Sequence, residues 1–156
     1  MHVTLRMREH VWNLRSRRSF QRICSCFAKA RGRFGARLIE FSVQGNHLHL
    51  VVEAEGHTAL SRALQGLCIR IAKALNAMME LRGPVFGDHY HARLLRSPTE
   101  LVNAIRYVLG NAAHHFGAQG RDPFCSSALV PAERLTLLAS PLSWLLREGF
   151  RRAAPG

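Results

Sequence analysis

Two histidines and one distant tyrosine are the residues of this chain whose types and spacing best fit catalytic chemistry. His47 and His49 lie in the segment 46–52, where polar and apolar residues alternate as they do in a β-strand. Because side chains alternate across a strand, the two imidazoles share one face, and two imidazoles supply half of a divalent-metal site. Tyr107 is one of only two tyrosines in the chain. A tyrosine beside a metal ion held by two histidines predicts nucleophilic attack on a phosphodiester.

The segment around Tyr107 has the pattern of a helix with one polar face. Residues 97–100, Ser-Pro-Thr-Glu, form a capping box with proline at the first helical position, so we expect a helix from there to about His115. Asn103, Tyr107 and Asn111 are spaced by four and share one face of that helix. If this face lies against the histidines, Asn111 would supply a third metal ligand and Tyr107 would lie beside a metal-bound phosphate.

The strand that precedes the histidines predicts a further contact through its register. A hairpin that turns at Gln44-Gly45 sets Glu40 directly opposite His49, and directly opposed side chains share a face and lie close together. A carboxylate in that position would orient the imidazole and raise its basicity. Two alternatives for Glu40 are direct contact with the ion and a salt bridge to an arginine of the first strand, such as Arg6.

The order of the expected elements predicts an α+β fold. The expected order is strand, helix, strand, strand, helix, strand and helix. This order is that of a ferredoxin-like or RRM-like split antiparallel sheet with helices on one face, here with an added C-terminal catalytic helix. Ile39, Phe41 and Val43 are expected on one face of the second strand. We assign residues 1–127 to a catalytic domain and 128–156 to a C-terminal extension packed on the same domain. The expected elements lie within residues 2–7, 16–30, 36–43, 46–52, 58–79, 85–95 and 97–115.

The composition indicates a folded domain that binds a polyanion. The chain has 156 residues, of which 47% are hydrophobic, and 22 basic residues against 10 acidic ones give a net charge of +12. Only two of the basic residues are lysines, and arginine is better suited to forked contacts with phosphate. Nucleic acid is the first expectation; the alternative is a GC-rich genome that favours arginine codons.

Several basic side chains are candidates for contact with DNA. The cluster at residues 15–18 would bind backbone phosphate or would be a solvated face, and the sequence does not decide between these. His89 and His91 flank Tyr90, which on a strand would point to the opposite face, so we expect a structural or DNA-contacting role for that trio. The candidate contacts are Arg6, Arg15, Arg17, Arg18, His89 and His91.

The cysteines and the absence of long apolar segments indicate a cytoplasmic protein with no membrane span. Cys24, Cys26, Cys68 and Cys125 lack the paired spacing of a zinc site, so we expect free and mostly buried thiols. The sequence contains no signal peptide and no long apolar run.

In their order and spacing, several motifs together resemble the single-tyrosine HUH transposases of the insertion-sequence type, and most closely the REP-associated tyrosine transposases. The resemblance covers about residues 1–127, and the chain departs from the family where Ala112 follows Asn111, a position at which the family often has proline. The motifs are residues 1–6, Gly45 to Val52, Gly83 to Phe86 with His89 to His91, Tyr107 to Asn111, and a weak echo at 123–127.

The resemblance implies a metal-dependent endonuclease and strand transferase that acts on single-stranded or hairpin DNA. It implies a 5′-phosphotyrosine on Tyr107, Mg²⁺ or Mn²⁺ held by His47, His49 and Asn111, and a monomer or homodimer. One alternative is a domesticated or inactive relative that binds DNA hairpins without cleavage. A third hypothesis is a basic RNA-binding domain, since split sheets also bind RNA.

Overall fold

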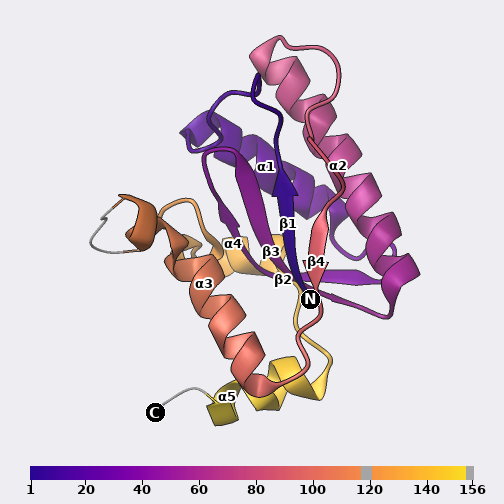
Figure 1. Cartoon of the computed structure of the whole chain (residues 1–156), viewed down its shortest axis with the longest axis vertical. Helices are drawn as coiled ribbons and strands as arrows, with labels where there is room; N and C mark the ends of the chain where they lie inside the picture. Colours follow the sequence, from indigo (N-terminus) through magenta and orange to yellow (C-terminus); the bar gives the residue numbers. More distant parts are fainter. Residues whose placement is uncertain (117–120, 154–156) are drawn as a thin grey trace.

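The computed structural model describes residues 1–116 and 121–153, which contain a four-stranded antiparallel sheet. Its strands follow the spatial order β2-β3-β1-β4, so the first strand lies in the centre beside the strand that carries the histidines (Figure 1). This is the order of a ferredoxin-like split sheet, and the predicted fold class is confirmed. The strands are β1 (His2–Arg6), β2 (Ala36–Val43), β3 (His47–Ala54) and β4 (His91–Arg93).

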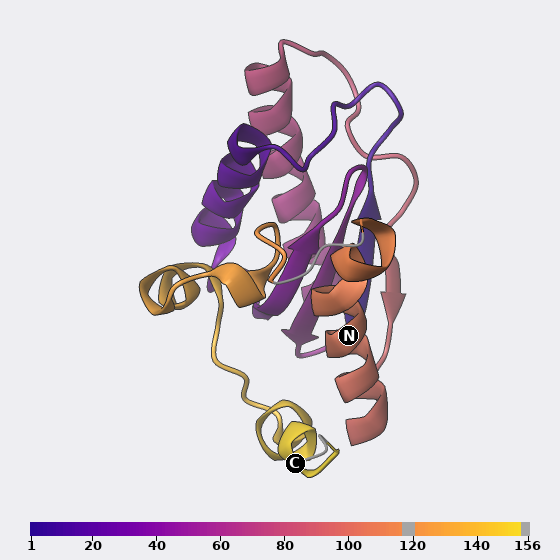
Figure 2. The same ribbon diagram turned by 90° about the vertical axis from the view of Figure 1, so that its left-hand side faces the viewer.

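Two helices, α1 (Arg17–Ala30) and α2 (His57–Met79), cover one face of the sheet (Figure 2). Helix α1 begins where the Ser16 hydroxyl accepts the backbone N–H of Ser19, at 3.1 Å. The apolar stripes of both helices pack on the side chains that the central strands direct to this face, and together they form the main core. Its buried members include Val3, Leu5, Ile23, Phe27, Phe41, Leu48, Leu50, Leu60, Leu64, Ile71 and Leu75.

Helix α3 (Pro98–Phe116) covers the opposite face. The Ser97 hydroxyl accepts the backbone N–H of Glu100 at 3.2 Å, and the Glu100 carboxylate accepts the N–H of Arg96 at 2.8 Å. The predicted capping residues therefore start the helix. A second, smaller core joins α3 to the sheet; its buried members are Ile39, Val51, Leu95, Leu101, Ala104 and Val108.

A β-bulge in β2 overturns one expectation about that strand. The pairing with β3 shifts between Leu38 and Glu40, and a bulge adds one residue and so interrupts the alternation of faces. Phe41 and Val43 belong to the main core, whereas Ile39 lies in the smaller core under α3. The prediction that Ile39 shares a face with Phe41 and Val43 was therefore wrong.

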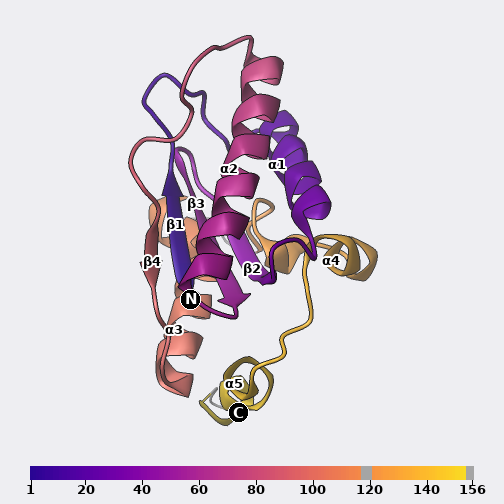
Figure 3. The same ribbon diagram turned by 90° about the vertical axis from the view of Figure 1, so that its right-hand side faces the viewer.

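The chain beyond α3 returns along the free edge of β2. The backbone N–H of Val43 donates to the carbonyl of Phe124 at 2.8 Å. Leu137 and Leu138 then join the main core, and the last helical segment packs against α3 (Figure 3). Within the described ranges, none of the helices is both long and apolar enough to cross a membrane. The elements of this region are a 3₁₀ turn (Ser126–Ala128), α4 (Pro131–Leu137), a π-helical turn (Leu145–Gly149) and α5 (Phe150–Ala153).

The four cysteines are free thiols, as expected, and each is buried or half-buried. Burial raises the pKa of the Cys24 and Cys68 thiols to about 12. These two groups therefore carry no thiolate near neutral pH, and the helices that hold them use them as small apolar residues.

Candidate functional site

The side of the sheet under α3 carries a polar patch built by β1 and β3, which we call the histidine face: His2, Thr4, Arg6, His47 and His49. Antiparallel pairing sets Thr4 opposite His49 and Arg6 opposite His47. Opposed residues share a face, and so do residues two apart in one strand. As predicted, His47 and His49 lie side by side, and the leucine between them is fully buried in the main core.

A chain of close contacts runs through three imidazoles on this face. His47 Nε2 lies 3.1 Å from His49 Nε2, and His49 Nδ1 lies 3.1 Å from His2 Nε2. Thr4 Oγ1 is a second neighbour of the same His49 Nδ1, at 3.2 Å. His47 Nδ1 lies 2.8 Å from Asn46 Oδ1. Both nitrogens of His49, which is 4% exposed, are therefore engaged and its ring orientation is fixed.

The environment of His2 favours its neutral form. Burial lowers the pKa of His2 below its ordinary value, and the positive charges of the amino terminus and of Arg93 lower it further. A neutral imidazole has one N–H donor and one acceptor nitrogen. His2 can therefore accept a hydrogen bond from a neighbouring ring at neutral pH.

Tyr107 projects from α3 onto the histidine face. Its ring centroid lies 5.1 Å from that of His49 and 5.7 Å from that of His2, both in edge-on geometry. The residue is 49% exposed and lines one pocket with Thr4 and Asn103. The structure thus brings the sequence-predicted tyrosine and histidines together with one side open to a substrate.

Asn111 lies one helical turn beyond Tyr107 on the same face of α3 and is 3% exposed. Its Nδ2 atom is buried and has no hydrogen-bond partner among the residues that the structure describes. A buried amide without a partner is costly, and a half-turn of the amide exchanges its nitrogen for its oxygen. A ligand position requires the amide oxygen, so Asn111 would hold an ion in the turned orientation, with its oxygen where the unpaired nitrogen now lies.

The two Nε2 atoms of His47 and His49 have the separation that a shared metal ion demands. Two nitrogen ligands about 2.1 Å from one ion and roughly 90–109° apart lie about 3.0–3.4 Å from each other, and the observed separation is 3.1 Å. In the part of the chain that is described, no three His, Cys, Asp and Glu side chains are arranged to hold a metal ion. A site here would therefore combine the two imidazoles with an amide such as that of Asn111.

The β2–β3 hairpin turns one residue later than predicted. The backbone N–H of Gln44 donates to the carbonyl of His47 at 2.8 Å, so Gly45 and Asn46 form the turn. A shift of the turn by one residue moves every cross-strand pair by two. Ser42, and not Glu40, therefore lies opposite His49, and the predicted pairing of Glu40 with His49 was wrong.

Glu40 belongs to an ion pair with the C-terminal region. Its partner in the sheet is Val51, and its carboxylate accepts hydrogen bonds from the Ser126 hydroxyl and from the Arg134 guanidinium, the latter at 2.9 Å. The carboxylate thus ties β2 to the 3₁₀ turn and to α4. One alternative considered for Glu40 was a salt bridge to an arginine of the first strand; the structure shows one to Arg134 instead.

Arg15 has a structural role that the sequence did not predict. Its guanidinium forms a bidentate ion pair with Asp122, at 2.9 and 3.0 Å, and donates to the carbonyl of Val43 at 3.0 Å. It also lies over the ring of Phe124, 4.7 Å from the centroid. With side-chain exposures of 14% and 5%, the pair holds the return segment against the sheet.

The other candidate DNA contacts lie on the surface. Arg6 and His91 are on the same side of the sheet as the metal-binding candidates, because His91 pairs with Thr4. Tyr90 points to the opposite side, as expected, where its hydroxyl lies 2.8 Å from that of Ser61 on α2. The exposed candidates are Arg6, Arg17, Arg18, His89 and His91.

Sequence reasoning missed His2 and Thr4 as members of the site. Both lie on the polar side of the first strand, whose alternation was recognised, but the neighbour of that strand in the sheet was needed to bring them to His49. In a split antiparallel sheet the first and third strands are adjacent. That rule, applied to the expected strands, would have put the polar residues of β1 beside the histidines.

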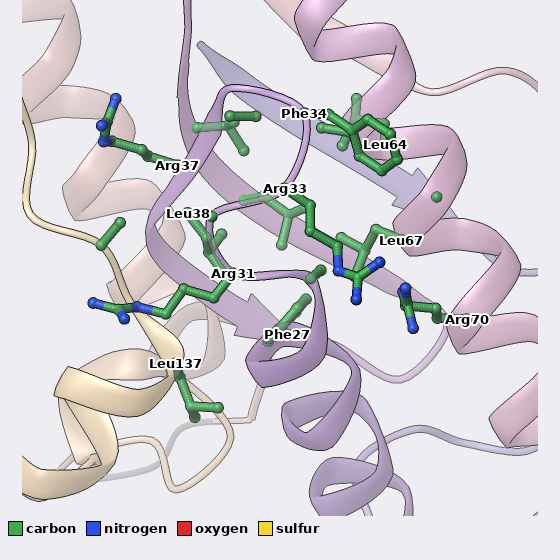
Figure 4. A pocket seen from close by; sticks show the side chains of 18 residues that line it. Phe27, Arg31, Arg33, Phe34, Arg37, Leu38, Leu64, Leu67, Arg70 and Leu137 are labelled. Carbon is green, nitrogen blue, oxygen red and sulfur yellow. The ribbon is translucent and has the colours of Figure 1, made fainter.

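A second, apolar pocket lies on the opposite side of the sheet, between α1, α2 and β2 (Figure 4). Its walls include Phe27, Leu64 and Leu67, and arginines surround its mouth. It contains none of the residues predicted to do chemistry.

Comparison with known proteins agrees with the fold. Residues 1–111 match the family model of IS200-like transposases, and the chain belongs to this family. The fold is similar to a solved structure of a REP-associated tyrosine transposase bound to a REP hairpin, with a TM-score of 0.64 and 15% sequence identity. The similarity covers 91% of this chain and 86% of that chain. No curated protein sequence matches the chain.

Proposed function

We propose that this transposase is a metal-dependent endonuclease and strand transferase for single-stranded DNA, with Tyr107 as its nucleophile. The observation that carries the proposal is the approach of the Tyr107 ring to the His49 imidazole, 5.1 Å between centroids, on an open polar face. Membership of the IS200-like transposase family supports strand transfer as the reaction class.

The residues that would hold the ion are His47 and His49, through their Nε2 atoms, and Asn111, through its amide oxygen. The 3.1 Å separation of the two nitrogens and the unsatisfied amide support this set. Mg²⁺ or Mn²⁺ bound there supplies positive charge that polarises a phosphoryl oxygen.

In the proposed step, the Tyr107 oxygen attacks the phosphorus of a phosphodiester in the DNA. A bond forms between the phenol oxygen and phosphorus, and the bond between phosphorus and the 3′ oxygen of the preceding nucleotide breaks. The phenol loses its proton, and the departing oxygen gains one as a free 3′-hydroxyl. The resulting 5′-phosphotyrosine keeps the phosphodiester linkage for later transfer to another 3′-hydroxyl.

The proposed substrate is single-stranded DNA that carries a hairpin. The solved structure with the similar fold is bound to a REP hairpin, and this chain has a net charge of +12. Arg6 and Arg93 lie beside the histidines on the same side of the sheet. Arginines in this position would bind the phosphates that flank the bond to be cut.

A covalent-adduct assay tests the proposal. The protein is incubated with a labelled single-stranded hairpin DNA and Mn²⁺, and the products are separated on a denaturing gel. We expect a labelled protein–DNA adduct with the wild type and none with Tyr107→Phe. Tyr90→Phe is the matched control, because it removes the phenol on the opposite side of the sheet, and it should retain the adduct.

The outcomes separate the candidate functions. An adduct with Tyr107→Phe that disappears with Tyr90→Phe would contradict the assignment of the nucleophile. Tight binding of the hairpin by the wild type without any adduct would indicate a relative that binds hairpins and does not cut them. Binding of RNA in preference to the same sequence as DNA would indicate the RNA-binding alternative.

A further inference from the structure

The Nδ1 atom of His49 is contacted by two side chains from the neighbouring strand. His2 Nε2 lies 3.1 Å away and Thr4 Oγ1 lies 3.2 Å away. Thr4 is the direct partner of His49 in the sheet, and His2 is two residues along on the same side. Regular strand pairing between β1 and β3 therefore directs both groups at one nitrogen.

The contacts of His47 indicate which tautomer His49 needs for both rings to bind one ion. For both Nε2 atoms to ligate one ion, each ring must carry its proton on Nδ1. Asn46 Oδ1 lies 2.8 Å from His47 Nδ1, and an amide oxygen only accepts, so this contact holds the proton of His47 on Nδ1. His49 needs an equivalent acceptor beside its own Nδ1.

We propose that His2 and Thr4 are positioning residues that accept the Nδ1–H of His49 and so leave its Nε2 lone pair for the ion that His47 would share. This inference rests on the proposed metal site. Imidazole ligands of metals commonly donate their second N–H to an acceptor, which fixes the tautomer and raises the basicity of the ligand. The Thr4 hydroxyl oxygen and an imidazole ring nitrogen can both accept a hydrogen bond.

The two acceptors, His2 and Thr4, are redundant, and this redundancy leads to a specific prediction. Loss of one leaves the other within 3.2 Å of the same nitrogen. Either single change should therefore weaken metal binding by less than about tenfold, whereas loss of both should weaken it by about 10–100-fold, the usual cost of removing such a partner. The effects of the two substitutions should be more than additive in free energy.

The experiment measures Mn²⁺ affinity by calorimetry for the wild type, His2→Phe, Thr4→Val and the double variant. His2→Phe keeps a ring beside Tyr107 and removes the acceptor, and Thr4→Val keeps the volume and removes the hydroxyl. His2→Gln, whose amide oxygen can accept in place of Nε2, should restore most of the affinity when combined with Thr4→Val. His57→Phe, on α2 across the sheet, is the matched control and should bind Mn²⁺ as the wild type does.

Proton NMR of the protein loaded with Zn²⁺, a diamagnetic probe, supplies a readout that a purely structural role would not change. The His49 Nδ1–H should give a slowly exchanging signal in the wild type and in each single variant, and this signal should be lost in the folded double variant. A double variant with wild-type Mn²⁺ affinity would overturn the inference and leave the metal site intact. A wild type that does not bind Mn²⁺ would instead refute the proposed metal site itself.

Discussion

On the α1/α2 side of the sheet, the side chains of β1 and β3 are apolar, and Val3, Leu5, Leu48 and Leu50 are at most 2% exposed. On the α3 side, the same two strands present imidazoles, a hydroxyl and a guanidinium. On this side, apolar residues of α3 pack against the sheet around Val51. The rest of this side forms the pocket that His49 lines together with Tyr107 of α3. One side therefore stabilises the fold, and the other is free to carry chemistry.

The difference shows how a small domain combines stability and reactivity in one strand. Successive residues of β3 alternate between a sealed core and an open polar face, so a change at one position should affect one property and spare the other. The side chains that line the apolar pocket on the core side include none of these imidazoles (Figure 4). The following experiments challenge this separation, from the largest expected effect to the smallest.

Substitution of either candidate ligand should have the largest effect. His47→Ala and His49→Ala should each reduce Mn²⁺-dependent adduct formation by more than about 100-fold, because the charge held at the phosphate is lost. The free energy of unfolding should fall by only about 1–2 kcal/mol, since these side chains face a polar site. Quantified adduct gels and urea denaturation measure the two effects. A double variant that bound Mn²⁺ as tightly as the wild type would refute the assignment of these ligands.

Substitution of Leu50, which follows His49 and points to the core side of β3, should reduce stability and leave metal binding unchanged. Leu50→Ala should lower the free energy of unfolding by about 2–5 kcal/mol, because it opens a cavity in the main core. The Mn²⁺ affinity of the protein that remains folded should not change. Urea denaturation and calorimetry at low temperature provide the two numbers. A loss of less than about 1 kcal/mol, or a change in Mn²⁺ affinity, would show that the two sides are not independent.

Glu40→Gln tests the register of β2 in the structure. Because the carboxylate pairs with Arg134 and not with His49, Mn²⁺ affinity should stay at the wild-type level. Stability should fall by about 1 kcal/mol, since the pair is partly exposed and screened by solvent. Arg134→Gln removes the other partner and should give a similar loss. A tenfold weaker Mn²⁺ affinity with Glu40→Gln alone would support the register first expected from the sequence.

The smallest expected effect is on the salt dependence of DNA binding. A single-strand contact to one phosphate contributes about −0.7 to the slope of log K against log salt. Arg6→Ala, on the histidine face, should reduce the magnitude of the slope by about that amount, whereas Arg62→Ala, on α2, should leave it unchanged. Fluorescence anisotropy with labelled hairpin DNA at several salt concentrations measures it. Equal slopes for Arg6→Ala and the wild type would remove Arg6 from the interface.

Elements defined by local signals were predictable. β2 spans residues 36–43 as expected, and α3 begins at the capping residues that the sequence contains. These features depend on neighbours within a few positions. By contrast, β4 is limited to His91–Arg93 within the expected 85–95 segment. The chain leaves the edge of β1 before His91 although β1 continues to Arg6, and in the described part of the chain only an isolated bridge between Phe86 and Met7 pairs the earlier part of the segment.

Non-local geometry explains the errors at the site. The turn at Gly45-Asn46 sets the partner of Glu40, and a shift of one residue in the turn was enough to move Glu40 away from His49. The ion pair between Arg15 and Asp122 joins segments far apart in the chain, so no local pattern predicted it.

The sequence by itself determined which residues can do chemistry and which of them share a face. Alternation in β3 and the four-residue spacing in α3 fix the sides of His47, His49, Tyr107 and Asn111, because backbone geometry repeats with a constant period. Only the tertiary structure decided which groups meet across strands and helices. The pairing of β1 with β3 brought His2 and Thr4 to His49, and packing of α3 on the apolar end of the sheet brought Tyr107 to the same imidazole. Such contacts depend on register and on how apolar surfaces are buried over the whole domain, which no short stretch of sequence specifies.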